Sequence, residues 1–492
     1  MRKTFRIALF LVLSINLTYG QNSSDKSYDK IDSLVQKYYE SFEASGLAVG
    51  IIRQGNDYYS KALGYQNIMT KIPLSEYSVF HMASISKPVT ATIIAKLYED
   101  DLIDIDKPYT YYVPFFKMAD TLYNKVTIRQ LVTHLSGMPY IDNYQFENPT
   151  FDSTASYQLV QDLSQKKLLR EPGEKYDYSN YAYDILAELV KQVTKQTFED
   201  YATEHIFQPL SMKYSTFLKA EINDSIATSP HVYSDSTFEI TVSSSYPYNR
   251  LHAPSSCFHS NLNDMRIWIE SNLDRGIYNG NRILSDSIYN LLWTPAVERR
   301  KSGFVGFGWF IDDYNNTQII HHAGGDPGYK NFLVLIPSLE TGIIVMSNSE
   351  SIPPQKLAYE IIDILQGKSV ELPKKPISFP IGKAIIQKNS ETARELYYEL
   401  KENDLESYDF SEKWLNNLGY DIMIRYKFDK AIAIFKLNTE TYPESANTWD
   451  SLGDGYFWKG DKENAIKSFK KALEIDPDKK NSLNRLKQLE KQ

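Results

Sequence analysis

Two kinds of hydrophobic patterning divide the chain. From about residue 27 to 366, short runs rich in β-branched and aromatic residues alternate with helical stretches and with turns marked by glycine and proline. From about residue 385 onward the pattern is almost wholly helical, rich in lysine and glutamate and poor in glycine and proline. The segment between them, ELPKKPISFP (371–380), contains three prolines and is typical of a linker. We therefore predict an α+β domain over 27–366, a linker over 367–384 and an all-α domain over 385–492.

A period of 34 residues runs through the helical region. Identical residues recur at this offset in six pairs: Leu418 and Leu452, Gly419 and Gly453, Ala431 and Ala465, Ile432 and Ile466, Phe435 and Phe469, and Pro443 and Pro477. This period and residue order resemble the tetratricopeptide repeat, whose helix pairs stack through small residues and end near a proline. The earlier stretch RELYYELKEND is a candidate for a degenerate third unit. So short an array is either a docking surface for a peptide or protein partner, or a buttress packed on the preceding domain.

The first twenty residues have the features of a secretory signal peptide. Arg2, Lys3 and Arg6 form a basic start, and the apolar run IALFLVLSI precedes a boundary near Gln21. We predict that residues 1–20 are removed and that the protein is periplasmic or secreted, the alternative being an uncleaved N-terminal anchor. The apolar run is too short to span a bilayer and no second run of about 18 apolar residues follows, so no transmembrane helix is expected.

Composition narrows the classes of function. The 492-residue chain is 42% hydrophobic and 24% charged, which is typical of globular domains. Its net charge of -8 gives no basic footprint, so a nucleic-acid partner is not expected. Cys257 is the single cysteine, and an exported chain of this kind must be stabilised by its core rather than by an internal disulfide.

The candidate chemistry begins at HMASISKPVTATIIAKLYED (81–100). Ser84 and Lys87 are three residues apart at the predicted start of an apolar helix, where Pro88 is tolerable only in the first turn. This spacing places the lysine one turn along on the face of the serine. A lysine held in a poorly solvated pocket is driven toward its neutral form and can then accept the serine proton. A solvated surface pair is the plainer interpretation of these two residues taken alone.

A second element is EPGEKYDYSNYAYDILAELV (171–190). Tyr178 and Asn180 follow a Pro-Gly turn and precede an amphipathic helix. A buried tyrosine beside a lysine ammonium can ionise below its usual pKa of about 10 and shuttle a proton. The amide of Asn180 could orient a substrate carbonyl, although such a turn is more commonly only a helix cap.

A third element should form the far wall of the cleft. The stretch QIIHHAGGDPGYKNFLVLIPSLETGIIVMSN predicts three strands joined by turns at GGDPG and SLETG, and we place the wall at residues 322–325 within it. There the backbone N–H of Gly325 could join that of Ser84 in an oxyanion hole. The KSG at 301–303 is the other candidate, but its lysine lies in a charged loop run. His321 and His322 should point to opposite faces of a strand, so a metal site is not expected.

The three patterns Ser84-x-x-Lys87, Tyr178-x-Asn180 and His322-x-Gly324 stand in an order that resembles the serine β-lactamase and penicillin-binding protein family, specifically its class C β-lactamase-like branch. The similarity extends over about 340 residues, roughly two-thirds of the chain. Other stretches that carry it are VFHMASISK, LVTHLSGMP, REPGEKYDYSNYAYDILAEL, PLSMKYSTF, GFGWF and HAGGDPGY.

This resemblance implies a fold and a set of roles. The fold would be two-lobed, with an antiparallel sheet and flanking helices packed against an all-helical lobe and the cleft between them. Ser84 would be the acylated nucleophile, Lys87 and Tyr178 the proton-transfer partners, Asn180 a substrate-positioning group, and His322 the wall residue facing the substrate. Which of the lysine and the tyrosine is the base in each step stays open.

The chain departs from the β-lactamase pattern in two places. His322 replaces the usual lysine of the third motif, and similar His-x-Gly variants occur in D,D-peptidases, D-aminopeptidases and esterases of the branch. Resistance to β-lactams is therefore not the default interpretation. The stretch PSSCFHSNLND (254–264) stands where the branch more often has a Gly-Gly pair, which leaves the shape of the substrate open.

Other motifs favour structural roles. No GxSxG elbow surrounds Ser136, so residues 133–139, including His134, are interpreted as a helix end and a turn. Trp309 and Phe310 are expected in the core or the cleft wall. The sequence contains no phosphate loop or dinucleotide fingerprint, and no cofactor is implied.

The leading hypothesis is an exported serine hydrolase that cleaves an amide or ester through an acyl-enzyme at Ser84, with water performing deacylation. A D-amino-acid peptide is the first candidate substrate and a small ester the second. The alternative is a non-catalytic binding protein, in which the hydrolase fold presents a ligand pocket and the repeats recruit a partner.

Overall fold

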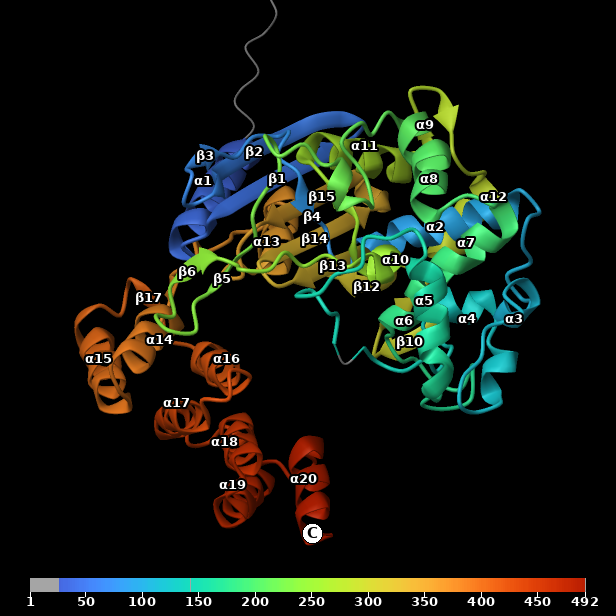
Figure 1. Cartoon of the computed structure of the whole chain (residues 1–492). Helices are drawn as coiled ribbons and strands as arrows, with labels where there is room; N and C mark the ends of the chain where they lie inside the picture. The colour runs from blue at the N-terminus through green and yellow to red at the C-terminus, as the bar shows by residue number, and fades with distance from the viewer. Residues whose placement is uncertain (1–25, 142, 492) are drawn as a thin grey trace, which may run out of the picture.

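The computed structural model describes residues 26–141 and 143–491, so the predicted signal peptide lies outside the described residues. Its centre is a nine-stranded sheet in which neighbouring strands are antiparallel (Figure 1). In spatial order the strands are β10 (Val297–Arg300), β11 (Gly303–Val305), β12 (Phe310–Tyr314), β13 (Thr317–Asp326), β14 (Tyr329–Ile336), β15 (Thr341–Ser347), β1 (Gly46–Arg53), β2 (Asn56–Asn67) and β3 (Ile72–Pro73).

The sheet joins strands from both ends of the first domain. β1 pairs with β15, so that Leu47 lies opposite Ser347, and the seven other strands follow on either side. The three strands predicted from the QIIHHAGG stretch are present as β13, β14 and β15, and the turns between them fall at residues 327–328 and 337–340. The expected α+β architecture, with an antiparallel sheet built from both ends of the domain, is therefore confirmed.

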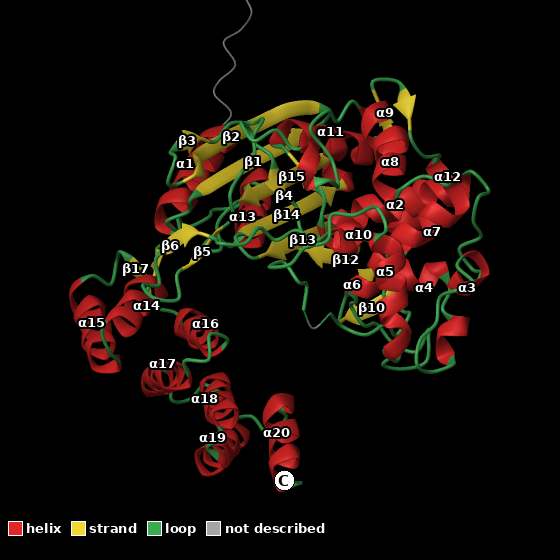
Figure 2. Ribbon diagram, in the orientation of Figure 1, coloured by secondary structure: helices red, strands yellow, loops and turns green. Residues whose placement is uncertain are grey.

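Each face of the sheet is covered by helices, and the strands alternate accordingly (Figure 2). Along β14, Phe332 and Val334 pack into one cluster with α1 (Lys26–Ser41) and α13 (Pro354–Leu365). Leu333 points to the opposite face, into the cluster that contains α2 (Ser86–Glu99) and α11 (Leu262–Leu273). This period of two fixes which residues of each strand face the helical lobe.

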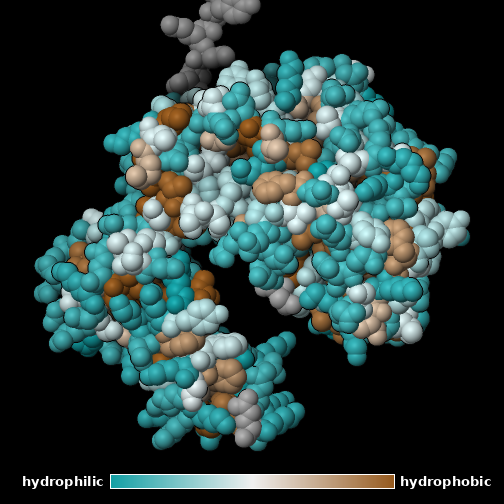
Figure 3. All heavy atoms as spheres, viewed as in Figure 1, coloured by the Kyte–Doolittle hydropathy of each residue, from teal (hydrophilic) through white to brown (hydrophobic). Residues whose placement is uncertain are grey.

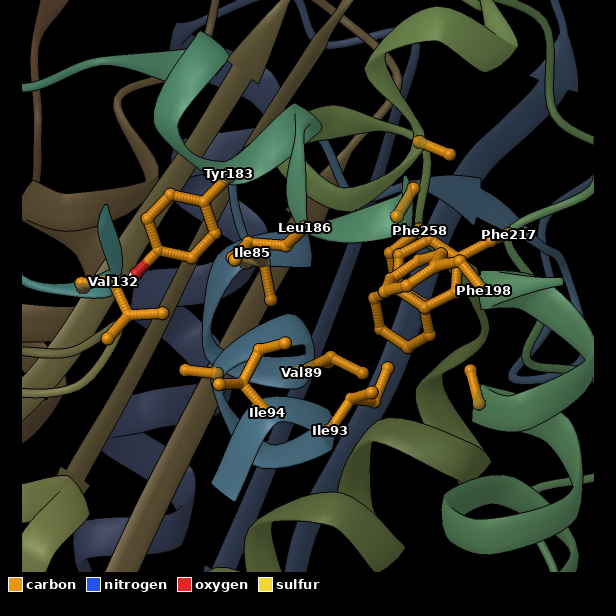
Figure 4. Close-up of a cluster of buried hydrophobic side chains, with 14 of the residues drawn as sticks. Ile85, Val89, Ile93, Ile94, Val132, Tyr183, Leu186, Phe198, Phe217 and Phe258 are labelled. Carbon is orange, nitrogen blue, oxygen red and sulfur yellow. Dashed lines mark hydrogen bonds between the residues drawn. The ribbon is translucent and has the colours of Figure 1, made fainter. Parts of the chain in front are cut away.

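The helical lobe packs around α2, which is buried along almost its whole length. In Figure 4, Val89 and Ile93 of this helix lie on the side of a cluster of aromatic rings that includes Phe217 and Phe258, whereas Ile94 lies on the side of Val132. A helix that is apolar on all sides belongs in a core, so the first turn of α2 is held firmly. The other helices of this domain are α3 (Tyr109–Tyr112), α4 (Ile128–Val132), α5 (Ala155–Asp162), α6 (Asn180–Asp184), α7 (Leu186–Thr194), α8 (Phe198–Ala202), α9 (Gln208–Leu210), α10 (Ala253–Ser256) and α12 (Asp286–Trp293).

Short two-stranded pairings connect the larger elements. They are formed by β4 (Phe80–His81) with β7 (His259–Ser260), β5 (His231–Tyr233) with β6 (Ile240–Val242), β8 (Ile277–Tyr278) with β9 (Asn281–Arg282), and β16 (Lys375–Pro376) with β17 (Tyr408–Asp409). The first of these pairs leads directly into the turn before α2. No helix in the described ranges is both long and apolar enough to cross a membrane.

The C-terminal helices form an arm beside the sheet domain, drawn orange to red in Figure 1. The expectation of a linker as far as residue 384 is wrong in its second half, because residues 378–384 already belong to a helix. Pro380 is compatible with this helix because it falls in the first turn, where backbone N–H groups have no intrahelical partner. The helices are α14 (Ser378–Gln387), α15 (Ser390–Asn403), α16 (Glu412–Met423), α17 (Phe428–Thr441), α18 (Ala446–Lys459), α19 (Lys462–Ile475) and α20 (Lys480–Glu490).

The 34-residue period has a direct packing cause. A Cβ atom at Gly419 would overlap the ring of Phe435, and one at Gly453 would overlap the ring of Phe469. In each repeat, the phenylalanine of the second helix therefore lies flat against the backbone of the first. Glycine and phenylalanine recur together because each is required by the other.

The arm is anchored to the sheet domain through aromatic residues. Phe238, in the loop between β5 and β6, packs against Gly382 of α14 and Leu418 of α16 within one buried cluster. Arg425 also pairs with Asp235 of the same loop at 2.7 Å. The inner repeats thus pack on the preceding domain, whereas Figure 3 shows a hollow between the outer repeats and the helical lobe.

Candidate active site

The candidate nucleophile lies in the turn between β4 and α2. Ser84 is partly exposed, and its carbonyl oxygen accepts a hydrogen bond from the backbone N–H of Lys87 (3.1 Å). The helix begins at Ser86, so Ser84 lies in the turn just before it and Lys87 in its first turn. The hydroxyl of Ser86 donates to the Ala83 carbonyl (2.6 Å) and accepts from the N–H of Phe258 (2.9 Å), which ties the turn to the neighbouring segment.

Lys87 is fully buried beneath this turn. Its ammonium nitrogen Nζ lies 3.0 Å from Ser84 Oγ and donates to the Ser255 carbonyl at 2.9 Å. Burial lowers the pKa of Lys87 to about 7, although the carboxylates of Asp184 and Asp326 oppose the shift. A substantial fraction of the lysine is therefore neutral near pH 7 and able to accept the serine proton.

Tyr178 completes a triangle around the serine. Its hydroxyl donates to Ser84 Oγ at 3.0 Å, and Lys87 Nζ lies 4.8 Å from the centre of its ring. Burial raises the pKa of Tyr178 well above its usual value, which is the opposite of the lowered pKa expected from the sequence. The cause is that desolvation of the phenolate outweighs the cation nearby. The resting site thus contains a neutral phenol and a readily deprotonated lysine.

Asn180 is the first residue of α6, two residues after Tyr178. The helix is capped by Ser179, whose side chain accepts from the N–H of Ala182, so Asn180 is not the capping residue. Its Nδ2 donates to the hydroxyl of Tyr144, whereas its Oδ1 is buried and has no hydrogen-bond partner among the described residues. The amide therefore offers an acceptor rather than a donor to a ligand.

The predicted turn at residues 133–139 supports Tyr178. His134 is buried, and its Nδ1 accepts the backbone N–H of Ser179 at 3.1 Å. Its ring centre lies 4.4 Å from that of Tyr178, and burial keeps its pKa well below the usual value. The neutral imidazole thus fixes the loop that carries the tyrosine, while Ser136 accepts the backbone N–H of Met138 within its own turn.

The third element lies on β13, opposite the serine. A Cβ atom at Gly324 would overlap the Met82 carbonyl oxygen, so only glycine allows this strand to approach the nucleophile turn so closely. A Cβ at Gly325 would meet only the flexible end of Lys330, at 3.5 Å. The Gly in the His-x-Gly pattern is thus a requirement of packing at the site.

His322 provides a neutral wall. Its Nδ1–H donates to the Ala323 carbonyl at 2.7 Å and its ring stacks on Phe310 at 4.8 Å. Burial and the charge of Lys87 hold its pKa well below the usual value, so it does not supply the fixed positive charge of a lysine. His321 faces the other side of the strand and contacts Asp312 at 2.9 Å.

The alternative sites are not supported by the geometry. Lys301 is exposed in the turn between β10 and β11. Within the described part of the chain, no group of three His, Cys, Asp or Glu side chains is arranged to hold a metal ion.

Sequence reasoning missed three groups at the site. Asp326 ends β13, and its Oδ2 accepts hydrogen bonds from His81 Nε2 (2.7 Å) and from the Ser256 hydroxyl. The Ser255 carbonyl binds the lysine, and Tyr144 binds Asn180. The signal that could have identified Asp326 is the alternation of side chains along a strand, which puts residues 322, 324 and 326 on the same face.

Two family models match the chain. The model described as Beta-lactamase matches residues 31–366, and the one described as Tetratricopeptide repeat matches residues 446–479. The first covers more than half of the chain, and the second lies on α18 and α19, where the 34-residue period is strongest.

Individual relatives agree with the first model. Protein flp of Staphylococcus aureus (strain MW2) is 26% identical over 334 residues, which cover 67% of this chain and 65% of that protein, so the chain spans about two-thirds of the relative's length. Penicillin-binding protein 4* of Bacillus subtilis (strain 168) is 26% identical over 338 residues, covering 65% of this chain and 72% of that protein. The structure of the octameric penicillin-binding protein homologue from Pyrococcus abyssi has the same fold, with a TM-score of 0.63 at 23% identity over 73% of this chain and 81% of that one.

Proposed function

Because this chain belongs to the β-lactamase family of serine hydrolases, we propose that it is an exported hydrolase that cleaves an amide or ester bond through an acyl-enzyme at Ser84. The observation that carries the proposal is the triangle around the serine, in which Lys87 Nζ and the Tyr178 hydroxyl each lie 3.0 Å from Ser84 Oγ. A surface Ser/Lys pair would have neither the buried lysine nor the second polar contact.

The proposed acylation step uses these groups in turn. Neutral Lys87 accepts the proton of Ser84 as Oγ attacks the carbonyl carbon, and the N–H groups of Ser84 and Gly325 stabilise the oxyanion. The proton then returns through the Tyr178 hydroxyl to the leaving nitrogen or oxygen as the bond to the carbonyl carbon breaks. A water molecule attacks the acyl-enzyme in the same way and regenerates the serine.

The proposed substrate is a D-amino-acid peptide of the kind found in cell-wall fragments, or else a small ester. Similarity to two proteins named for penicillin binding supports the first. The neutral His322 in place of a lysine supports either of these over a dedicated β-lactamase, because the wall supplies no fixed cation for a β-lactam carboxylate.

The direct test is the intact mass of the mature protein after exposure to a penicillin and, separately, to a fluorophosphonate. We expect a covalent adduct in the wild type and none in Ser84→Ala. Labelling by penicillin would favour peptidase-like recognition, and labelling by the fluorophosphonate alone would favour an esterase or aminopeptidase. Absence of both adducts in a folded wild-type protein would contradict the proposal.

The pH dependence of acylation follows from Lys87. Its neutral form is the base, and the fraction of neutral lysine rises as the pH passes its pKa of about 7. We therefore expect the rate of fluorophosphonate labelling to increase about tenfold per pH unit below the pKa and to level off above it. Labelling rates between pH 5 and 9, with circular dichroism as a control for folding, measure this. A rate that is flat across the range would contradict the assignment of Lys87 as the base.

A further inference from the structure

A carboxylate beside the oxyanion strand has no place in the proposed acylation step. The side chain of Asp326 is only 10% exposed, and both of its hydrogen bonds, from His81 and Ser256, end on Oδ2. Within the described residues, Oδ1 accepts no hydrogen bond. The residue follows Gly325 directly and lines a cavity of about 830 Å³ that also includes Gly325 and Tyr144. The Oδ1 oxygen is therefore free to accept a hydrogen bond from a ligand in this cavity.

The neighbouring amide points to the same kind of ligand. Asn180 gives its Nδ2 to Tyr144, so the group that remains for a ligand is the buried, unpaired acceptor Oδ1. Burial and, second to it, the charge of Asp326 raise the pKa of the Tyr144 hydroxyl. Asn180 and Asp326 therefore both present acceptors beside the serine, and acceptors bind a group that donates hydrogen bonds.

The charges of the cavity agree with this. Its lining carries the carboxylates of Asp326, Glu147 and Glu350 and one cation, Lys330. Lys330 lies opposite Gly325 on β14 and so shares the outer sheet face with Phe332, away from the nucleophile. Its charge partly opposes the burial that raises the pKa of Asp421 of α16 to about 6. The lining therefore carries three carboxylates and one cation, and its net charge is negative.

We propose that this cavity binds the ammonium group of the substrate, with Asp326 as its ion-pair partner. Asn180 is not part of the lining, but its Nδ2 contacts the lining residue Tyr144, and its Oδ1 is the second acceptor of the proposal. Asp326 directly follows the proposed oxyanion donor Gly325, so the Cα atoms of the two residues are about 3.8 Å apart. An α-ammonium is two bonds from the carbonyl carbon under attack. The substrate class is therefore a peptide, amide or ester whose acyl residue has a free amino terminus. This inference rests on the proposed function, because it takes Ser84 as the point of attack.

The test compares substrates that differ only in the ammonium. Alanine p-nitroanilide, in both enantiomers, is compared with its N-acetyl derivative in the wild type and in Asp326→Asn, which keeps the shape of the side chain. We expect the wild type to prefer the free ammonium and Asp326→Asn to lower the ratio of the two kcat/KM values by at least about 30-fold. Glu147→Gln, which removes a carboxylate from the exposed rim of the same cavity, is the matched control and should change the ratio less than about threefold.

The ratio is the decisive quantity because Asp326 also acts on Lys87. Removing the carboxylate lowers the pKa of the lysine for every substrate alike. An equal loss of activity on both substrates, or a wild-type preference for the N-acetyl compound, would overturn the proposal.

A binding measurement separates this inference from the proposed function. D-alaninamide and N-acetyl-D-alaninamide are titrated calorimetrically into Ser84→Ala, which needs no catalysis. Binding of the free amine alone, lost in the double variant with Asp326→Asn, supports the ammonium site even if no anilide is cleaved. Equal binding of both amides, or binding of neither, contradicts it.

Discussion

Replacement of Lys87 by methionine is expected to slow acylation of Ser84 by about 10³-fold. Methionine is close to lysine in length but cannot accept a proton. Tyr178 cannot replace the lysine as the base, because burial raises its pKa and keeps it a protonated phenol. Folding should be retained, because a buried charge is replaced by an apolar chain of similar volume. The rate of fluorophosphonate labelling, followed by intact mass, measures the effect.

Lys96→Met is the matched control. Lys96 lies on the same helix but is partly exposed and pairs with Asp100 at 2.6 Å, so its loss should leave the labelling rate within about twofold. The thermal unfolding midpoint of each variant confirms that the site is intact. If Lys87→Met were labelled within tenfold of the wild type, the lysine would not be the base and Tyr178 would be the next candidate.

The sequence was sufficient for those parts of the molecule that depend on local patterns. Short apolar runs bounded by glycine predicted β13, β14 and β15, because each strand and turn is specified by adjacent residues. The 34-residue period predicted the helix pairs, because Gly453 and Phe469 require one another. Three short motifs placed Ser84, Lys87 and Tyr178 together, and their mutual distances agree with that expectation.

What could not be predicted depends on segments that meet only in the folded chain. The direction of the Tyr178 pKa shift depends on how completely the surrounding lobes exclude water from the side chain, and no local motif indicates this. The Ser255 carbonyl reaches Lys87 from 168 residues away, and a backbone acceptor has no sequence signature.

Gly324 gives the second large effect we expect. Gly324→Ala should lower the labelling rate of Ser84 by about 10²-fold, because the added methyl group overlaps the Met82 carbonyl two residues before the nucleophile. Either β13 or the turn must shift, and a misplacement of about 1 Å at a reacting group costs a factor of this size. The same overpacking should destabilise the fold by about 1–3 kcal/mol, measured by urea unfolding.

Gly325→Ala is the control for Gly324→Ala, because it adds a methyl group to the same strand without displacing it. At this site the new methyl group meets only the end of Lys330, at 3.5 and 3.6 Å, and the backbone N–H remains. Stability should therefore change by less than about 1 kcal/mol, and the small fluorophosphonate should label the variant within about threefold of the wild type. If both alanine variants were equally impaired, the close approach of β13 to the Ser84 turn would not be the cause. If neither were impaired, the strand would have room to move and the oxyanion donor would have to lie elsewhere.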